Sequence, residues 1–160
     1  MKKKVDDDLY TFSISWRVRF DEIDVQGIVH HSEIVKYLEI ARIEYWRHLG
    51  IGYGEFRVAG FDFVVAGLEC IYLKPLYFDK IIRVKARAEA ISRASMTFQY
   101  LIYDCENRPA VWARTQLVCV KVGHSRPHPM PLNFPRQVIA FEKPGSIEDR
   151  TGISDKDDHN

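Results

Sequence analysis

Residues 32–50 read SEIVKYLEIARIEYWRHLG, and their apolar side chains recur at the i, i+3, i+4, i+7 spacing of one helix face. This face consists of Ile34, Tyr37, Leu38, Ala41, Tyr45 and Leu49. Further apolar residues lie outside it, at Val35, Ile40, Ile43 and Trp46. Ser32 is suited to the N-cap, and Gly50 to the position just past the helix end. The spacing therefore predicts one helix that is buried on most of its sides.

The segments on either side of this helix have the alternation of apolar and polar side chains that is typical of β-strands. The predicted strands are 12–20, 62–78, 80–91, 95–103 and 110–122. Short connections near 92–94 and 104–109 favour an antiparallel meander for the last three strands. One apolar helix must then be covered by one antiparallel sheet. We expect an α+β protein whose sheet curls around the helix and whose edges favour pairing with another subunit.

The chain is expected to form one domain followed by a tail. With 160 residues, of which 46% are hydrophobic, it is long enough for a single core. Residues 124–135, HSRPHPMPLNFP, contain four prolines and are predicted to form no regular element. Residues 144–160 are polar and charged, which is typical of disorder. The predicted boundaries are a domain over residues 1–143 and a disordered tail over 144–160.

Charge and composition exclude several classes of protein. The formal net charge is +1, and no basic stripe with interleaved aromatic residues is present, so we expect no nucleic-acid partner. No window approaches the roughly 18 apolar residues of a membrane span, and MKKK at the start is followed by polar residues rather than by an apolar signal segment. The three cysteines form no CxxC pair and are odd in number, which favours reduced thiols. We expect a soluble, cytoplasmic protein.

Residues 21–34, DEIDVQGIVHHSEI, place acids, a glycine and two histidines directly before the predicted helix. Backbone N–H groups at a helix start lack intrahelical partners, and Gly27 allows a tight turn, so Asp24 and these donors can face one point. Alternatively, Asp24 only forms the turn before the helix. Asp21 and Glu22 are predicted to be turn or surface acids. His30 and His31 are neighbours without a ligand at metal spacing, so we expect no metal site.

Residues 18–42, VRFDEIDVQGIVHHSEIVKYLEIAR, resemble the opening of the hotdog-fold thioesterases of the 4-hydroxybenzoyl-CoA thioesterase family, nearest the Tol–Pal-associated acyl-CoA thioesterase branch. The matching positions are Arg19–Phe20, Glu22–Ile23–Asp24, Gly27, Ile28–Val29, His30–His31 and the segment Tyr37–Arg42. The resemblance continues through residues 72–84 and covers roughly residues 12–140. The chain departs from the family pattern in having Glu22 for aspartate, His30 for an aromatic residue and Glu33 for asparagine.

The resemblance implies a hotdog fold and the hydrolysis of an acyl-CoA to a free acid and CoA, without a metal or other cofactor. It implies that Asp24 is the catalytic carboxylate, acting as a nucleophile or as a general base toward water. The implied oxyanion donor is the backbone N–H of His31, whose side chain is a further catalytic candidate. The substrate-binding candidates are Gly27, His30, Arg93 and Ser95, the last two for the CoA phosphates. A homodimer or homotetramer with its sites at the subunit interface is also implied.

Three other functions stay open at this level. The chain could be an acyl-carrier-protein thioesterase or a non-catalytic module that binds acyl thioesters. It could also be an enoyl-thioester hydratase, but hydratases of this fold carry an aspartate and a histidine four residues apart. Here the intervals from Asp24 are six residues to His30 and seven to His31, which disfavours hydration.

Overall fold

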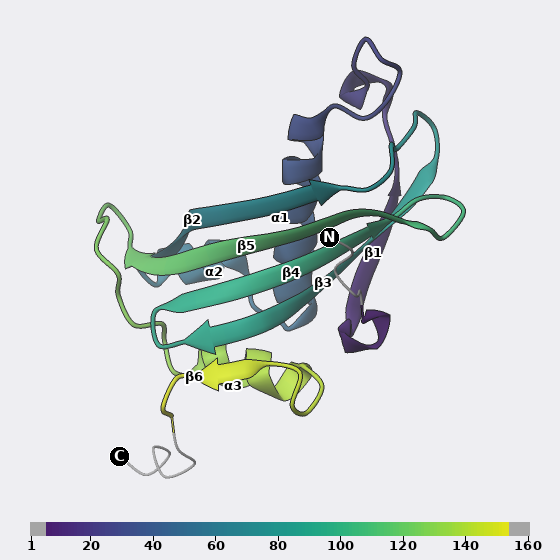
Figure 1. The fold of residues 1–160 in the computed structure, drawn as a ribbon. Helices are drawn as coiled ribbons and strands as arrows, with labels where there is room; N and C mark the ends of the chain where they lie inside the picture. Colours follow the sequence, from purple (N-terminus) through teal and green to yellow (C-terminus); the bar gives the residue numbers. More distant parts are fainter. Residues whose placement is uncertain (1–5, 154–160) are drawn as a thin grey trace.

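The structure is a computed structural model that describes residues 6–153. Figure 1 shows a curved sheet with α1 crossing one of its faces. The helices are α1 (His31–His48), α2 (Tyr53–Val58) and α3 (Asn133–Phe141), with 3-10 turns at Asp7–Leu9 and Phe20–Glu22. The strands are β1 (Phe12–Arg17), β2 (Phe61–Tyr72), β3 (Ile81–Ser92), β4 (Ser95–Tyr103), β5 (Pro109–Lys121) and β6 (Glu148–Arg150). Within residues 6–153, no helix is both long and apolar enough to cross a bilayer.

The sheet has the strand order β1-β3-β4-β5-β2, and all of these neighbours are antiparallel. The short turns on both sides of β4 confirm the predicted meander. β2 ends at Tyr72 rather than at 78, because the chain leaves the ladder just before Pro75, which has no N–H to donate. This leaves β2 on one edge of the sheet, with its outer edge unpaired among residues 6–153.

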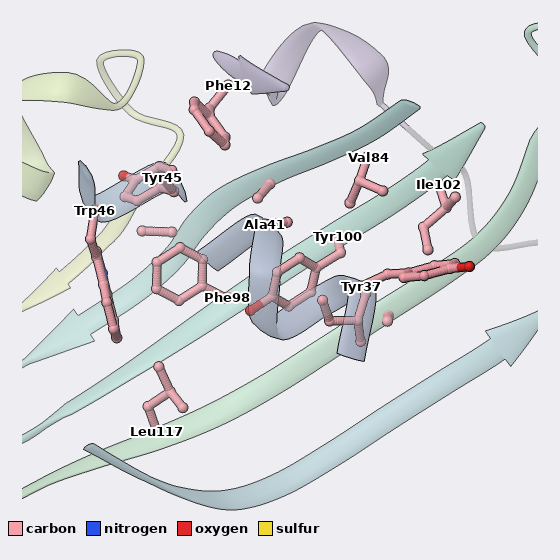
Figure 2. Packing of buried hydrophobic residues seen from close by; sticks show 14 of the residues in the cluster. Phe12, Tyr37, Ala41, Tyr45, Trp46, Val84, Phe98, Tyr100, Ile102 and Leu117 are labelled. Atoms are coloured by element: carbon pink, nitrogen blue, oxygen red, sulfur yellow. The ribbon is translucent and has the colours of Figure 1, made fainter. Parts of the chain in front are cut away.

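The core lies between α1 and the sheet. Figure 2 shows side chains of α1 facing those of β3, β4 and β5. The largest of these side chains that are fully buried include Tyr37, Leu38, Tyr45, Phe98, Tyr100 and Leu117. Burying each leucine or phenylalanine among them contributes about 1.5–3 kcal/mol to folding. Val35 and Ile40 of α1 are exposed, so the helix is less enclosed in one chain than its composition predicts.

The C-terminal region is more regular than its composition predicts. The proline-rich segment 124–135 runs into α3, and Pro135 is its third residue, in the first turn where a helix tolerates proline. Residues 144–153 differ from the disordered tail that was expected, because β6 pairs in parallel with β3 over Ala90–Ser92. The guanidinium of Arg87 also donates to the carbonyl of Ser146 at 2.7 Å. The rest of that expectation falls on residues 154–160, outside the described residues.

Candidate active site

A short antiparallel hairpin over residues 22–30 carries Asp24 to the start of α1. Gly27 has a φ of 77°, which lets the chain reverse within a few residues. The hairpin is closed by the Ile23–Val29 bridge and by the N–H groups of Asp24 and His30, which donate to the carbonyls of Ile28 and Glu22 at 2.9 Å. Since α1 begins at His31, one continuous segment brings together four of the predicted site residues, namely Asp24, Gly27, His30 and His31.

The two carboxylate oxygens of Asp24 have different surroundings. Oδ1 accepts the N–H of Gln26 at 2.8 Å, so Asp24 does form the turn that was the plainer alternative. Oδ2 has no hydrogen-bond partner among residues 6–153. Asp24 also lines a cleft of about 430 Å³ together with His31. The turn thus occupies one oxygen, and the other remains available to a molecule in the cleft.

The start of α1 leaves one backbone donor free. The N-cap is His30 rather than Ser32, because His30 has an extended backbone and its Nδ1 accepts the N–H of Ser32 at 3.2 Å. The N–H of Glu33 donates to the carbonyl of His30 at 2.9 Å. The N–H of His31 has no partner within the described residues. It lies at the positive end of the helix dipole, where it suits a developing negative charge. Gly50 follows the other helix end with a φ of 75°, as predicted.

The walls of the cleft come from the hairpin, from α1 and from the segment that follows β2. Its apolar lining consists of Ile28, Val29, Ile34, Leu73, Pro75, Leu76 and Val111. Tyr72 donates its hydroxyl to the carbonyl of His31 at 3.3 Å, and burial raises the pKa of this hydroxyl to about 12, so that it stays a donor. Lys74 is a cation in the same cleft that sequence reasoning did not single out. Lys74 lies within residues 72–84, where the chain resembles the thioesterase family, and this was the feature of the sequence that could have indicated it.

Arg93 and Ser95 lie at the opposite end of the sheet from Asp24. β2 joins the two regions, since Tyr72 at its end lines the Asp24 cleft and Phe61 at its start lines a separate apolar hollow with Arg93. Twelve residues of strand span roughly 36 Å. The Ser95 hydroxyl is also engaged with that of Ser92 at 2.7 Å. A single chain therefore does not bring the predicted phosphate-binding residues to the predicted catalytic residues.

Asp21 and Glu22 lie in a 3-10 turn, and Asp21 is exposed, but Glu22 is not the surface acid that was the other part of the prediction. Glu22 is only 6% exposed, because its carboxylate turns inward under α1 and accepts the hydroxyl of Tyr37 at 2.7 Å.

Among residues 6–153, no group of three or more His, Cys, Asp or Glu side chains is arranged to hold a metal ion. All three cysteines are free thiols.

A curved antiparallel sheet packed on one long buried helix is the arrangement of the hotdog fold, and Asp24 lines a cleft at the start of that helix. The sequence matches the Thioesterase-like superfamily over residues 18–139, and the chain belongs to this superfamily. It is therefore an enzyme, a thioester hydrolase, and the predicted hotdog fold is confirmed.

Similar proteins agree with this assignment. The chain is 39% identical to a putative esterase of Aquifex aeolicus, over 79% of this chain and 94% of the relative. It is 26% identical to the putative acyl-CoA thioesterase YneP of Bacillus subtilis, over 79% and 91% of the two chains. A thioesterase from Thermus thermophilus, solved in complex with coenzyme A and zinc, is 26% identical, has a TM-score of 0.72, and aligns over 84% of this chain and 97% of its own.

Proposed function

We propose that this protein hydrolyses acyl-CoA thioesters to a free acid and CoA. The observation that carries the proposal is that Asp24 and His31 line the same cleft, while one Asp24 carboxylate oxygen and the His31 N–H have no hydrogen-bond partner among residues 6–153. The names of the Bacillus relative and the coenzyme A bound by the Thermus protein support CoA as the thiol. Membership of the 4-hydroxybenzoyl-CoA family and its Tol–Pal-associated branch stays a prediction.

Asp24 acts in its ionised form by either of two routes. As a nucleophile it attacks the thioester carbon, the C–S bond breaks, and water then hydrolyses the acyl–aspartyl anhydride. As a general base it takes a proton from the water that attacks the same carbon. In both routes the CoA thiolate leaves and is protonated. Negative charge develops on the thioester oxygen, where the N–H of His31 stabilises it, and the apolar cleft walls strengthen this interaction. The His31 ring is a second donor near the thioester.

The substrate-binding residues complete this site in two places. Gly27 and His30 shape the hairpin and the helix start, against which the thioester lies. Arg93 and Ser95 supply a cation and a hydroxyl for CoA phosphates, and Lys74 adds a cation in the cleft itself. Since Arg93 is remote from Asp24 within one chain, we propose that a second copy provides it.

The exposed edge of β2 suits this second copy. Val65 and Leu68 are 50% and 46% exposed on this edge strand, which is where an apolar strand invites pairing. If two copies pair antiparallel along β2, the Phe61 end of one lies beside the Tyr72 end of the other. Arg93 of the partner subunit then lies near the Asp24 cleft. The proposed assembly is a homodimer, from which a homotetramer can form by pairing of dimers.

The purified protein is expected to release CoA from at least one member of a panel of aliphatic and aromatic acyl-CoAs, followed with a thiol reagent. The rate should be unchanged after dialysis against EDTA, because the proposed reaction uses no metal or other cofactor. Hydrolysis of acyl-carrier protein but not of acyl-CoA would redirect the proposal to the carrier-protein thioesterase. Binding of acyl-CoA without turnover would favour the non-catalytic module. We further propose a cytoplasmic location, since a reducing compartment keeps thiols free.

Light scattering is expected to give at least twice the chain mass of 18.7 kDa. The double variant Val65→Lys/Leu68→Lys should be monomeric and should lose most of its activity, because charges on the β2 edge oppose pairing. Val58→Lys is the matched control, since Val58 is an exposed apolar residue of α2, and this variant should keep the wild-type mass. A wild-type monomer that retains full activity would contradict the proposed assembly.

A further inference from the structure

Glu22 holds together three parts of the chain around the candidate site. Its Oε2 accepts the hydroxyl of Tyr37 and the backbone N–H of Arg19, each at 2.7 Å. Its backbone carbonyl accepts the N–H of His30 at 2.9 Å. The same residue therefore begins the hairpin that carries Asp24, pairs with the residue just before α1, and reaches α1 itself through Tyr37.

Tyr37 is a fixed point for this contact. It is 1% exposed, and the ring of Trp16 from β1 meets its ring edge-on at a centroid distance of 4.9 Å. Burial and the neighbouring Glu22 raise the pKa of its hydroxyl, so this group stays a donor. Tyr37 is six residues beyond His31, which is about 9 Å along a helix axis. A side chain held this firmly can set the position of whatever its hydroxyl binds.

A buried carboxylate is a costly way to fill this space. Removing a carboxylate from water is unfavourable unless hydrogen bonds replace its solvation, and an apolar side chain would avoid that cost. The carboxylate does offer direction, because its oxygens accept from donors at defined angles. Here the hydrogen bonds of Glu22 fix the hairpin that carries Asp24 relative to the start of α1, where the N–H of His31 lies.

We propose that Glu22 and Tyr37 form a brace that sets the distance between the carboxylate of Asp24 and the N–H of His31, and that Glu22 is a positioning residue for catalysis. The inference rests on the proposed function, because it assumes that the Asp24 carboxylate and the His31 N–H, whose separation the brace sets, both act in catalysis. Neither Glu22 nor Tyr37 lines the cleft, so the brace acts through the hairpin rather than on the substrate.

The same helix supplies a matched control. Tyr45 of α1 donates its hydroxyl to the carboxylate of Glu142 at 2.7 Å, and both residues are buried. Tyr45 is eight residues beyond Tyr37, near the other end of α1. Tyr37→Phe and Tyr45→Phe thus delete the same hydroxyl from the same kind of bond on the same helix. They differ in whether the lost bond anchors the Asp24 hairpin.

The experiment measures kcat and KM for one cleaved acyl-CoA in wild type, Tyr37→Phe, Tyr45→Phe, Glu22→Gln and Asp24→Ala, beside thermal melts. Tyr37→Phe is expected to lower kcat by about 10- to 100-fold with little change in KM, because a misplacement near 1 Å costs that much. Tyr45→Phe should keep kcat within about twofold of wild type. Its melting temperature should fall by about as much as that of Tyr37→Phe. The double variant Glu22→Gln/Tyr37→Phe should be no slower than the slower single variant, since both act on one brace.

The outcomes separate the brace from the proposed function. The brace is overturned if Tyr37→Phe keeps wild-type kcat, or if Tyr45→Phe loses as much, while Asp24→Ala is inactive. The proposed function fails, and the inference with it, if the wild type releases no CoA or if Asp24→Ala retains full activity. If Tyr37→Phe does not fold, Glu22→Leu takes its place, because it removes the acceptor of the Tyr37 hydroxyl, and it should lower kcat by the same amount, about 10- to 100-fold.

Discussion

Asp24→Ala is expected to lower kcat for acyl-CoA hydrolysis by about 100- to 10,000-fold, the range over which a positioned acid or base contributes to rate. The reason is geometric, because Asp24 lines the cleft beside His31 and its Oδ2 has no hydrogen-bond partner among residues 6–153. KM should change little, since Asp24 is proposed to act on the reacting carbon rather than to hold CoA. CoA release under saturating and limiting substrate, beside circular dichroism of the variant, measures both values.

Asp24→Asn is the sharper variant, because it separates catalysis from turn formation. Its amide oxygen can still accept the N–H of Gln26, so the hairpin keeps the turn that Oδ1 makes now. The charge is lost, and the expected fall in kcat is as large as for alanine. Asp21→Ala is the control, since Asp21 is an exposed acid three residues away, and it should keep wild-type kcat. An active Asp24→Asn enzyme would show that Asp24 is only a turn residue.

The main elements of the fold were predictable because their signals are local. The apolar spacing over 32–50 corresponds to α1, and the short turns beside β4 dictate an antiparallel meander. The helices α2 and α3 and the strand β6 were not predicted, and β6 depends on contacts with residues far away in the sequence. Arg87, for example, holds the carbonyl of Ser146 from the middle of β3, and the composition of the tail contains no sign of that partner.

The features of the candidate site also divide into those that follow from local sequence and those that depend on distant contacts. Asp24 and His31 lie on one segment of the chain, so their proximity follows from sequence order. The burial of Glu22 does not, because it depends on Tyr37, which lies on α1 and meets it only after the hairpin folds back. The separation of Arg93 from Asp24 is a property of the sheet, since the cleft of Asp24 lies at one end of β2 and the hollow of Arg93 lies at the other. Turn residues alone carry no information about such distances.

Phe98→Ala is expected to lower the free energy of unfolding by about 3–5 kcal/mol, the usual cost of removing a buried phenylalanine ring. Phe98 is fully buried on β4, where Figure 2 shows it facing α1. Its ring meets that of Tyr45 edge-on at 5.0 Å and that of Trp46 at 6.1 Å. Alanine leaves a cavity between helix and sheet that these rigid aromatic neighbours cannot fill without leaving their own contacts.

Urea unfolding at one fixed protein concentration measures this loss, since any association of chains also contributes to apparent stability. Phe20→Ala is the matched control, because it removes the same ring from a residue that is 80% exposed, and it should cost less than about 1 kcal/mol. Equal losses in the two variants would contradict the placement of α1 on this sheet. A large loss at Phe98 alone would mean that the contact between β4 and α1 holds the helix in place. The start of that helix is where the candidate catalytic groups meet, so the stability of the core and the geometry of the site depend on the same packing.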